Sequence, residues 1–89
     1  MIKSDLTICN KLGLHARAAA KLTKLAGSFS CEVHLSRNGR RVNAKSIMGV
    51  MMLAAGMGST VELETDGDDE ADAHRALALL IADRFGEAQ

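Results

Sequence analysis

The stretch Gly13-Leu14-His15-Ala16-Arg17 lies where the hydrophobic period of the chain changes. Residues 2–8 before it alternate between apolar and polar side chains, the pattern of a half-buried strand. Residues 16–26 after it carry apolar side chains three and four positions apart, the pattern of an amphipathic helix. We therefore expect a strand followed by a helix that begins near His15 and is capped at its end by Gly27.

The remaining segments continue this alternation of strands and helices. The Asn38-Gly39 pair is a strong hairpin signal between two alternating runs. Ser46 precedes a Met-rich apolar stretch that is too long for an ordinary strand and predicts a short helix, which breaks near Gly56 and Gly58. In order, we expect a strand over residues 29–36, a strand from residue 41, a helix from residue 46, a strand over residues 61–65 and a helix opened by the acidic residues 68–70.

These elements predict an α+β fold with two layers. Each expected strand has one apolar face and each helix has one apolar stripe, so helices packed on one face of an antiparallel or mixed sheet bury both. The first strand–helix–strand unit crosses over with right-handed geometry, which leaves room for another strand between its two strands. The sequence has no linker, repeat or low-complexity segment, so we expect one domain over residues 1–89.

The size and charge of the chain exclude several classes of protein. A chain of 89 residues is too short to enclose a large cavity, so any chemistry takes place at its surface. Its 11 basic and 11 acidic residues cancel, which argues against electrostatic binding to nucleic acid or to a membrane surface. Among Phe, Tyr and Trp only Phe29 and Phe85 occur, too few for stacking on bases.

The cysteines and the N-terminus indicate a cellular compartment. Cys9 and Cys31 match no metal-ligand spacing and are too few for a disulfide scaffold, so free thiols in a reducing environment are expected. The first five residues lead into a strand pattern rather than into the apolar core of a signal peptide. We therefore expect a cytoplasmic protein without a bound metal ion.

The position of His15 suggests phosphate chemistry. The first backbone N–H groups of a helix have no partner within the helix and carry the positive end of its dipole. They favour an anion, and Arg17 adds a permanently charged guanidinium beside them. A neutral imidazole at this place faces an anion-binding surface, so we expect a histidine beside a phosphate site. An isolated histidine at a helix start is more often a plain surface residue, so this hypothesis depends on the residues around it.

Two stretches of the sequence resemble the signatures of one family. They are Asn10-Lys11-Leu12-Gly13-Leu14-His15-Ala16-Arg17, followed by Ala19-Ala20, and Lys45-Ser46-Ile47-Met48-Gly49-Val50-Met51. Together they are similar to the HPr family, the histidine-containing phosphocarrier proteins of the phosphoenolpyruvate-dependent phosphotransferase system. The resemblance covers essentially the whole chain. It implies an open-faced sandwich of order βαββαβα, with a four-stranded antiparallel sheet in the order 1-4-2-3 and three helices on one face.

The resemblance also implies a function and the residues that carry it. His15 would receive a phosphoryl group at Nδ1 from enzyme I and pass it to enzyme IIA domains, while Arg17 and the backbone of Ala16 and Arg17 stabilise the phosphate. Such a protein is a carrier rather than an enzyme, needs no cofactor and acts as a monomer. The partner contacts implied in the same way are Ala20, Lys24, Ile47, Met48, Gly49 and Met51.

Ser46 has two interpretations that are compatible with each other. A serine ahead of an apolar helix is a good N-cap, which is the structural interpretation. The resemblance adds that many bacterial HPr proteins are phosphorylated at this serine by an HPr kinase/phosphorylase. A phosphate at a helix N-terminus is electrostatically favourable, so both roles can belong to one residue.

Some residues depart from the family pattern or lie outside it. The family commonly has proline directly after the arginine, whereas this chain has Ala18 and no proline at all. His34 and His74 lie outside both motifs, and we expect them to be exposed and without a role. Among the methionines, Met52 is expected to fill the core.

Three alternatives to an HPr-type sugar carrier remain open at this point. The chain could be an NPr-like carrier of a nitrogen-related phosphotransferase system with its own enzyme I. It could also be a regulatory binding module that acts only through phosphoserine, although such members lack the active histidine that His15 supplies here. A small-molecule-binding domain is the third alternative, and the sequence has no pocket-lining motif for it.

Overall fold

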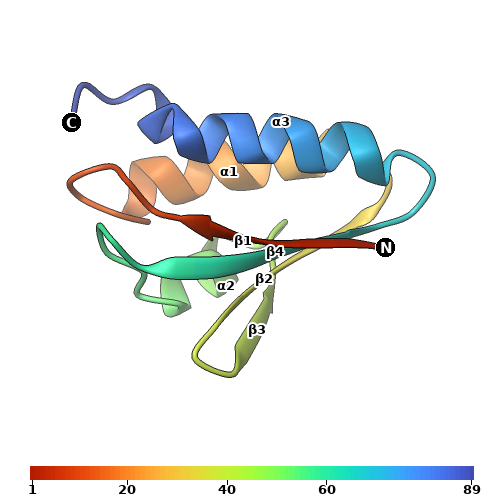
Figure 1. The fold of residues 1–89 in the computed structure, drawn as a ribbon, viewed down its shortest axis with the longest axis horizontal. Helices are drawn as coiled ribbons and strands as arrows, with labels where there is room; N and C mark the ends of the chain where they lie inside the picture. Colours follow the sequence, from red (N-terminus) through yellow and green to blue (C-terminus); the bar gives the residue numbers. More distant parts are fainter.

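A computed structural model describes all residues from 1 to 89 (Figure 1). It has four strands, three α-helices and one turn of 3-10 helix, in the alternating order that the hydrophobic periods predict. The elements are β1 (Ile2–Thr7), α1 (Ala16–Gly27), β2 (Glu32–Arg37), β3 (Arg40–Asn43), α2 (Ile47–Met52), β4 (Thr60–Asp66), α3 (Glu70–Ala82) and η1 (Arg84–Gly86).

The four strands form one sheet in the order β1-β4-β2-β3, and every neighbouring pair is antiparallel. This confirms the antiparallel sheet and its expected order. The crossover from β1 through α1 to β2 leaves a gap between these two strands. β4, the last strand in the sequence, fills this gap and pairs with both β1 and β2. In Figure 1, α1 and α3 lie side by side above the sheet, while the shorter α2 lies beside β3.

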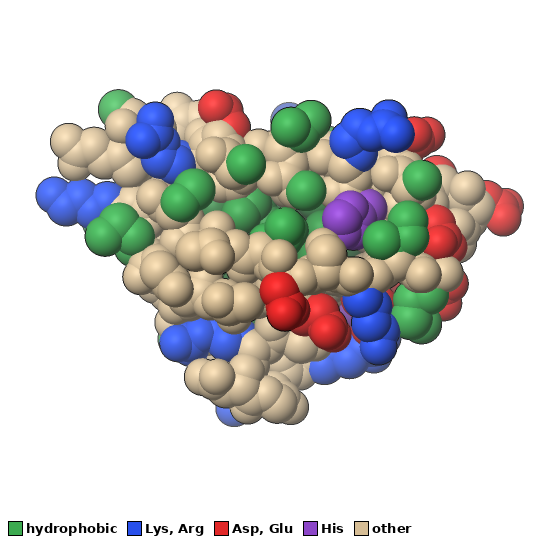
Figure 2. Space-filling model, viewed as in Figure 1, with side chains coloured by type: hydrophobic (Ala, Val, Ile, Leu, Met, Phe, Trp, Pro, Cys, Tyr) green, Lys and Arg blue, Asp and Glu red, His purple; other side chains and the backbone are tan.

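The core lies between the sheet and the two long helices. On β4, Val61, Leu63 and Thr65 alternate toward this layer and are buried, as the period of two requires. Figure 2 shows hydrophobic side chains along the seam between the helices and β1, and charged side chains around the periphery. The apolar stripes of α1 and α3 that meet the sheet consist of Ala18, Ala19, Leu22, Ala26, Ala73, Leu77 and Ile81.

The opposite face of the sheet carries charged side chains. Glu64 on β4 is buried there and accepts a hydrogen bond from Arg41 Nη2 on β3 at 2.7 Å. Lys3 on β1 lies on its other side, with Nζ 3.9 Å from the carboxylate. The hydrogen bond from Arg41 is the largest cause of the lowered pKa of Glu64. A paired, ionised carboxylate thus occupies the centre of the face that no helix covers.

Two element boundaries differ from the predicted ones. β2 begins at Glu32 rather than at Phe29, because the N–H groups of Ser30 and Cys31 donate to the Asp69 carboxylate instead of joining the sheet. α1 includes Gly27 and ends at Ser28 in a right-handed conformation, so no left-handed glycine caps it. Cys9 and Cys31 are free thiols, as expected.

Replacing Asp69 by asparagine is expected to weaken the contact between α3 and β2 and to flatten the acid dependence of stability. Hydrogen bonds, first from the Ser30 N–H, lower the pKa of Asp69 from 3.8 to about 2. A carboxyl whose pKa is lowered by folding stabilises the fold above its unfolded pKa of ~3.9 and loses that contribution as the pH falls toward about 2. Denaturant titrations of both proteins between about pH 7 and pH 2 measure this.

The difference in unfolding free energy between wild type and Asp69→Asn is therefore largest near neutral pH and shrinks at low pH. Asp68→Asn is the matched control, because Asp68 is exposed and makes no hydrogen bond or ion pair. A difference that stays constant down to about pH 2 would contradict this role of the Asp69 charge.

The length and composition of the helices bear on whether the chain could span a membrane. None of them combines the length and the apolar character needed to cross a bilayer.

Candidate functional site

His15 is the N-cap residue of α1, as the change of period predicts. Gly13, at φ 65°, makes the turn before it, and the Leu14 N–H donates to the Ala55 carbonyl at 2.9 Å. The first hydrogen bond of the helix runs from the Ala19 N–H to the His15 carbonyl at 2.8 Å. The N–H groups of residues 16–18 therefore have no partner in the protein and are available to an anion.

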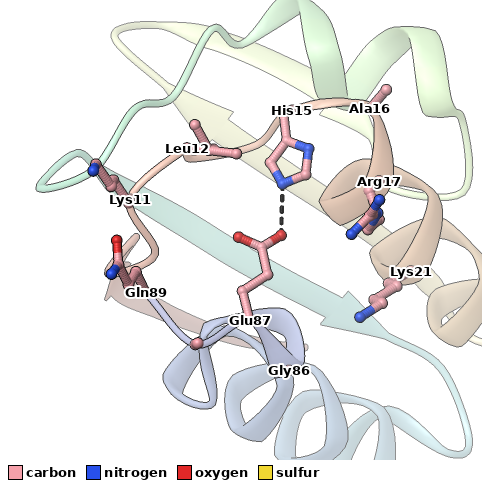
Figure 3. A pocket seen from close by; sticks show the side chains of 10 residues that line it. Lys11, Leu12, His15, Ala16, Arg17, Lys21, Gly86, Glu87 and Gln89 are labelled. Atoms are coloured by element: carbon pink, nitrogen blue, oxygen red, sulfur yellow. Dashed lines mark hydrogen bonds and ion pairs between the residues drawn. The ribbon is translucent and has the colours of Figure 1, made fainter.

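The His15 ring is anchored through one of its two nitrogens. Nε2 lies 2.5 Å from Oε2 of Glu87, near the C-terminus (Figure 3). The second nitrogen, Nδ1, makes no hydrogen bond within the protein, and Figure 3 shows it facing the start of α1 at Ala16. The ring nitrogen without a partner thus points to the place where the unpartnered N–H groups begin.

Glu87 is held in turn by Asn10, a residue of the loop between β1 and α1. Asn10 is fully buried, and its Nδ2 donates to Glu87 Oε1 at 3.0 Å and to the Gly13 carbonyl at 2.8 Å. The hydrogen bond from Asn10, followed by that from His15, lowers the pKa of Glu87. The carboxylate is therefore ionised near neutral pH and acts as an acceptor toward both neighbours.

The C-terminal segment reaches the site because η1 is anchored to the body of the protein. The Phe85 side chain is fully buried, and its carbonyl accepts a hydrogen bond from Lys21 Nζ of α1 at 2.6 Å. Sequence reasoning missed both Asn10 and Glu87 as site residues. Asn10 lies in a stretch whose residues are typical of a turn, so it was interpreted only as a turn residue. No sequence spacing connects Glu87 with a histidine 72 positions earlier.

An open hollow of about 890 Å³ surrounds the His15 ring. It is shallow and surface-exposed, as a chain of this size requires. Arg17 lines it from α1 and makes neither an ion pair nor a hydrogen bond, so its guanidinium is free for an anionic ligand. The side chains around the ring are cationic at three positions, Lys11, Arg17 and Lys21.

The residues expected to contact partners lie on the exposed parts of α1 and α2. Ala20 and Lys24 are exposed on α1, and α2 packs directly against that helix. Met48 is 72% exposed, and Ile47 and Met51 are exposed beside it. We call Ile47, Met48 and Met51 the α2 patch.

One residue of α2 differs from expectation. Met52 is 58% exposed rather than part of the core, because Val50 within this six-residue helix and Leu53 at its C-cap are the buried residues. Gly49 is half-buried, and a Cβ atom there would lie 3.3 Å from the Asn43 carbonyl. Its small size thus lets α2 approach β3 closely.

Ser46 is the N-cap of α2, which confirms the structural interpretation. Its Oγ accepts a hydrogen bond from the Gly49 N–H at 3.2 Å, and the residue is exposed. His34 and His74, expected to be exposed, are both half-buried. His74 Nε2 lies 2.6 Å from Ser4 Oγ, so this ring joins α3 to β1.

Replacing Ala18 by proline is expected to stabilise the protein by about 0.4–1 kcal/mol. Ala18 lies in the first turn of α1, and its N–H makes no hydrogen bond, so the substitution removes no bond. Proline also reduces the freedom of the unfolded chain. Thermal unfolding measures the change, and Ala19→Pro is the control, since its N–H bonds to His15 and its loss destabilises the helix. A lower melting temperature for Ala18→Pro would show that the buried site has no room for the ring.

Comparisons with known proteins show the family to which the chain belongs. Residues 2–83 match the family model described as "PTS HPr component phosphorylation site". The phosphocarrier protein HPr of Cupriavidus necator is 70% identical over 89 residues, which is the full length of both chains. The phosphocarrier protein NPr of Shewanella violacea is 42% identical, over 98% of this chain and 96% of the relative. A crystal structure of HPr from Thermoanaerobacter tengcongensis superposes with a TM-score of 0.96 at 44% identity and covers all of both chains. The chain that places His15 at the start of α1 belongs to the HPr family of phosphocarrier proteins of the phosphotransferase system.

Proposed function

We propose that this protein accepts a phosphoryl group from phosphorylated enzyme I on His15 Nδ1 and passes it to enzyme IIA domains. The observation that carries the proposal is the asymmetry of the His15 ring. Nε2 is occupied by Glu87, whereas Nδ1 is free and faces the unpartnered N–H groups at the start of α1. An imidazole reacts with phosphorus through an unprotonated, accessible nitrogen, and only Nδ1 meets that condition here.

The transfer from the donor to His15 is a single displacement at phosphorus. The Nδ1 lone pair forms a bond to the phosphorus of the donor, and the bond from phosphorus to the donor breaks, with its electron pair returning to the donor. The phosphoryl oxygens then lie near the N–H groups of residues 16–18 and the free guanidinium of Arg17, which stabilise their negative charge. Passing the group on to a IIA domain repeats the displacement in the opposite direction.

A carrier must bind its donor and its acceptors with the same small surface. The α2 patch supplies exposed, flexible methionine side chains on a helix that packs against α1, and such side chains adapt to different partners. Ala20 and Lys24 extend this surface along α1, where the small alanine permits close approach and the lysine complements an acidic partner. We propose this surface, together with Ala16, Arg17 and Gly49, as the docking site for both kinds of partner.

The proposal is tested by incubating the protein with phosphoenolpyruvate and enzyme I and measuring its intact mass. We expect one added phosphate that is labile in acid, as phosphoramidates are, and no adduct on His15→Ala. His74→Ala is the matched control, because this half-buried histidine lies outside the hollow and should not affect the uptake. An adduct that persists in His15→Ala, or no adduct on the wild type, would contradict the assignment.

We further propose that Ser46 is the target of an HPr kinase/phosphorylase. Ser46 is exposed and precedes the α2 patch directly, so a phosphate there adds about two negative charges beside the docking surface. These charges repel an acidic partner and slow the uptake on His15. With ATP and the kinase we expect an acid-stable adduct that Ser46→Ala abolishes and the exposed-serine control Ser28→Ala retains. An adduct that survives in Ser46→Ala would overturn this assignment.

An NPr-like role is the second candidate, and the 42% identity to an NPr protein supports it. The chemistry on His15 is the same in both roles. The two roles are distinguished by comparing the rates at which the enzyme I of the sugar system and the enzyme I of the nitrogen-related system phosphorylate the chain. The motif from Lys45 to Met51 is our reason for preferring the sugar system. In either role we propose a cytoplasmic monomer that carries phosphate stoichiometrically and is not itself an enzyme.

A further inference from the structure

The hydrogen atom between His15 and Glu87 can be assigned to one of its two neighbours. Glu87 Oε1 already accepts a hydrogen bond from the buried Asn10 amide, and Oε2 faces His15 Nε2 at 2.5 Å. An ionised carboxylate has acceptors only, so the hydrogen in this contact belongs to the ring. The neutral ring is therefore the Nε2–H tautomer, and its lone pair lies on Nδ1.

Glu87 is held in place from several directions. Asn10 Nδ2 donates both to Glu87 and to the carbonyl of Gly13, so a single amide ties the carboxylate to the turn that leads into α1. Buried Phe85 and the hydrogen bond from Lys21 fix the segment just before it. The hydrogen bonds from Asn10 to Glu87 and from Lys21 to the Phe85 carbonyl join the C-terminal segment to the loop and helix that present His15.

We propose that Glu87 is a positioning residue that holds His15 in the Nε2–H tautomer, so that Nδ1 is the nitrogen that receives the phosphoryl group, and that Asn10 orients Glu87 for this task. The inference rests on the proposed phosphocarrier function and extends it, since Glu87 lies outside both family signatures. Glu87 does not touch the incoming phosphorus and acts only through the ring.

The same contact accounts for the charge that forms during the transfer. Attack by Nδ1 on phosphorus, with the proton kept on Nε2, leaves the ring with a positive charge. The Glu87 carboxylate lies against that proton and neutralises this charge without any proton leaving the site. When the acceptor takes the phosphoryl group, the electron pair of the N–P bond returns to Nδ1 and the neutral tautomer is restored.

Substitution of Glu87 by glutamine gives an unusually sharp test. In Glu87→Gln the Asn10 N–H still requires an acceptor, so the new amide turns its oxygen toward Asn10 and its NH₂ toward His15. His15 Nε2 then becomes an acceptor, and the proton moves to Nδ1, the nitrogen that must react. Glu87→Leu instead leaves the ring with no partner. The isosteric variant is thus expected to be more damaging than the apolar one, which a merely structural role of Glu87 would not produce.

Two measurements follow on the full-length chain, with Gln89→Leu as the control from the same segment, since Gln89 lines the hollow but forms no hydrogen bond. The first is the tautomer of the unphosphorylated protein, read from ¹⁵N shifts of labelled histidine rings at about pH 9, where imidazoles are neutral. We expect Nε2–H in wild type and Gln89→Leu, and Nδ1–H in Glu87→Gln. An unchanged tautomer in Glu87→Gln would overturn the inference even if His15 is phosphorylated normally.

The second measurement is the initial rate of phosphoryl uptake from enzyme I. We expect a loss of about tenfold in Glu87→Leu and of about 100-fold in Glu87→Gln, the two ends of the range seen when the partner that orients a metal-binding histidine is removed. Equal rates in all variants would overturn the positioning role. A wild-type protein that takes up no phosphate contradicts the proposed function instead, and the tautomer result still decides whether Glu87 sets the ring.

Discussion

Gly13→Ala is expected to destabilise the protein by about 3 kcal/mol or more, from left-handed backbone strain of ~1–2 kcal/mol and overpacking of ~1–3 kcal/mol. Gly13 has φ 65°, and a Cβ atom there would lie 2.4 Å from the Ala55 carbonyl oxygen and 2.7 Å from the Gly56 Cα. Both obstacles are backbone atoms, and the Ala55 carbonyl also accepts the hydrogen bond from Leu14. The clash therefore cannot be relieved by rotating a side chain.

The control for this prediction is Gly39→Ala. Gly39 has φ 82° in the β2–β3 hairpin, and a Cβ atom there meets nothing within 4 Å, so this variant carries the backbone strain without the clash. Urea unfolding of both variants separates the two contributions. Equal losses would mean that the loop from Ala55 to Gly56 moves aside freely. In whatever fraction of Gly13→Ala stays folded, we expect slower phosphoryl uptake, because the turn that presents His15 is displaced.

Phe85→Ala is expected to cost about 3–5 kcal/mol, the range for removing a fully buried aromatic ring. Phe85 is fully buried and is one of the largest side chains of the core. Its backbone adopts φ 56°, a conformation unfavourable for a bulky residue, so packing of the ring keeps η1 in this shape. Denaturant unfolding monitored by circular dichroism measures the loss.

Phe85→Ala also has a functional consequence that distinguishes it from other core variants. Without the buried ring, the segment that carries Glu87 loses its main anchor, so we expect the His15 tautomer to become mixed in the folded protein. Leu63→Ala, a core variant on β4 rather than on η1, should lower stability but leave the tautomer unchanged. If both variants leave the ring as in wild type, the hydrogen bond from Lys21 is enough to hold the segment.

The local patterns of the sequence were sufficient for the order of strands and helices. The alternation in β1 and β4 and the apolar stripes of α1 and α3 reflect periods of two and 3.6 residues, which depend on neighbours only a few positions apart. The same holds for Ser46 as the N-cap of α2. The boundary of β2 was wrong by three residues, because Asp69, 38 positions beyond Cys31, takes the N–H groups that the strand would use.

The group that we propose to react could also be predicted from the sequence, since His15, Arg17 and the start of α1 are adjacent in sequence and a helix N-terminus attracts anions wherever it occurs. The choice between the two ring nitrogens could not. It depends on Glu87, which lies 72 residues away and reaches the ring only because Phe85 is buried and Asn10 is placed beside it. Periodicity and capping are properties of neighbouring residues, so the sequence alone determined where the histidine stands. A hydrogen bond between the two ends of the chain exists only once the fold brings them together, so the tertiary structure decided which of its nitrogens is free.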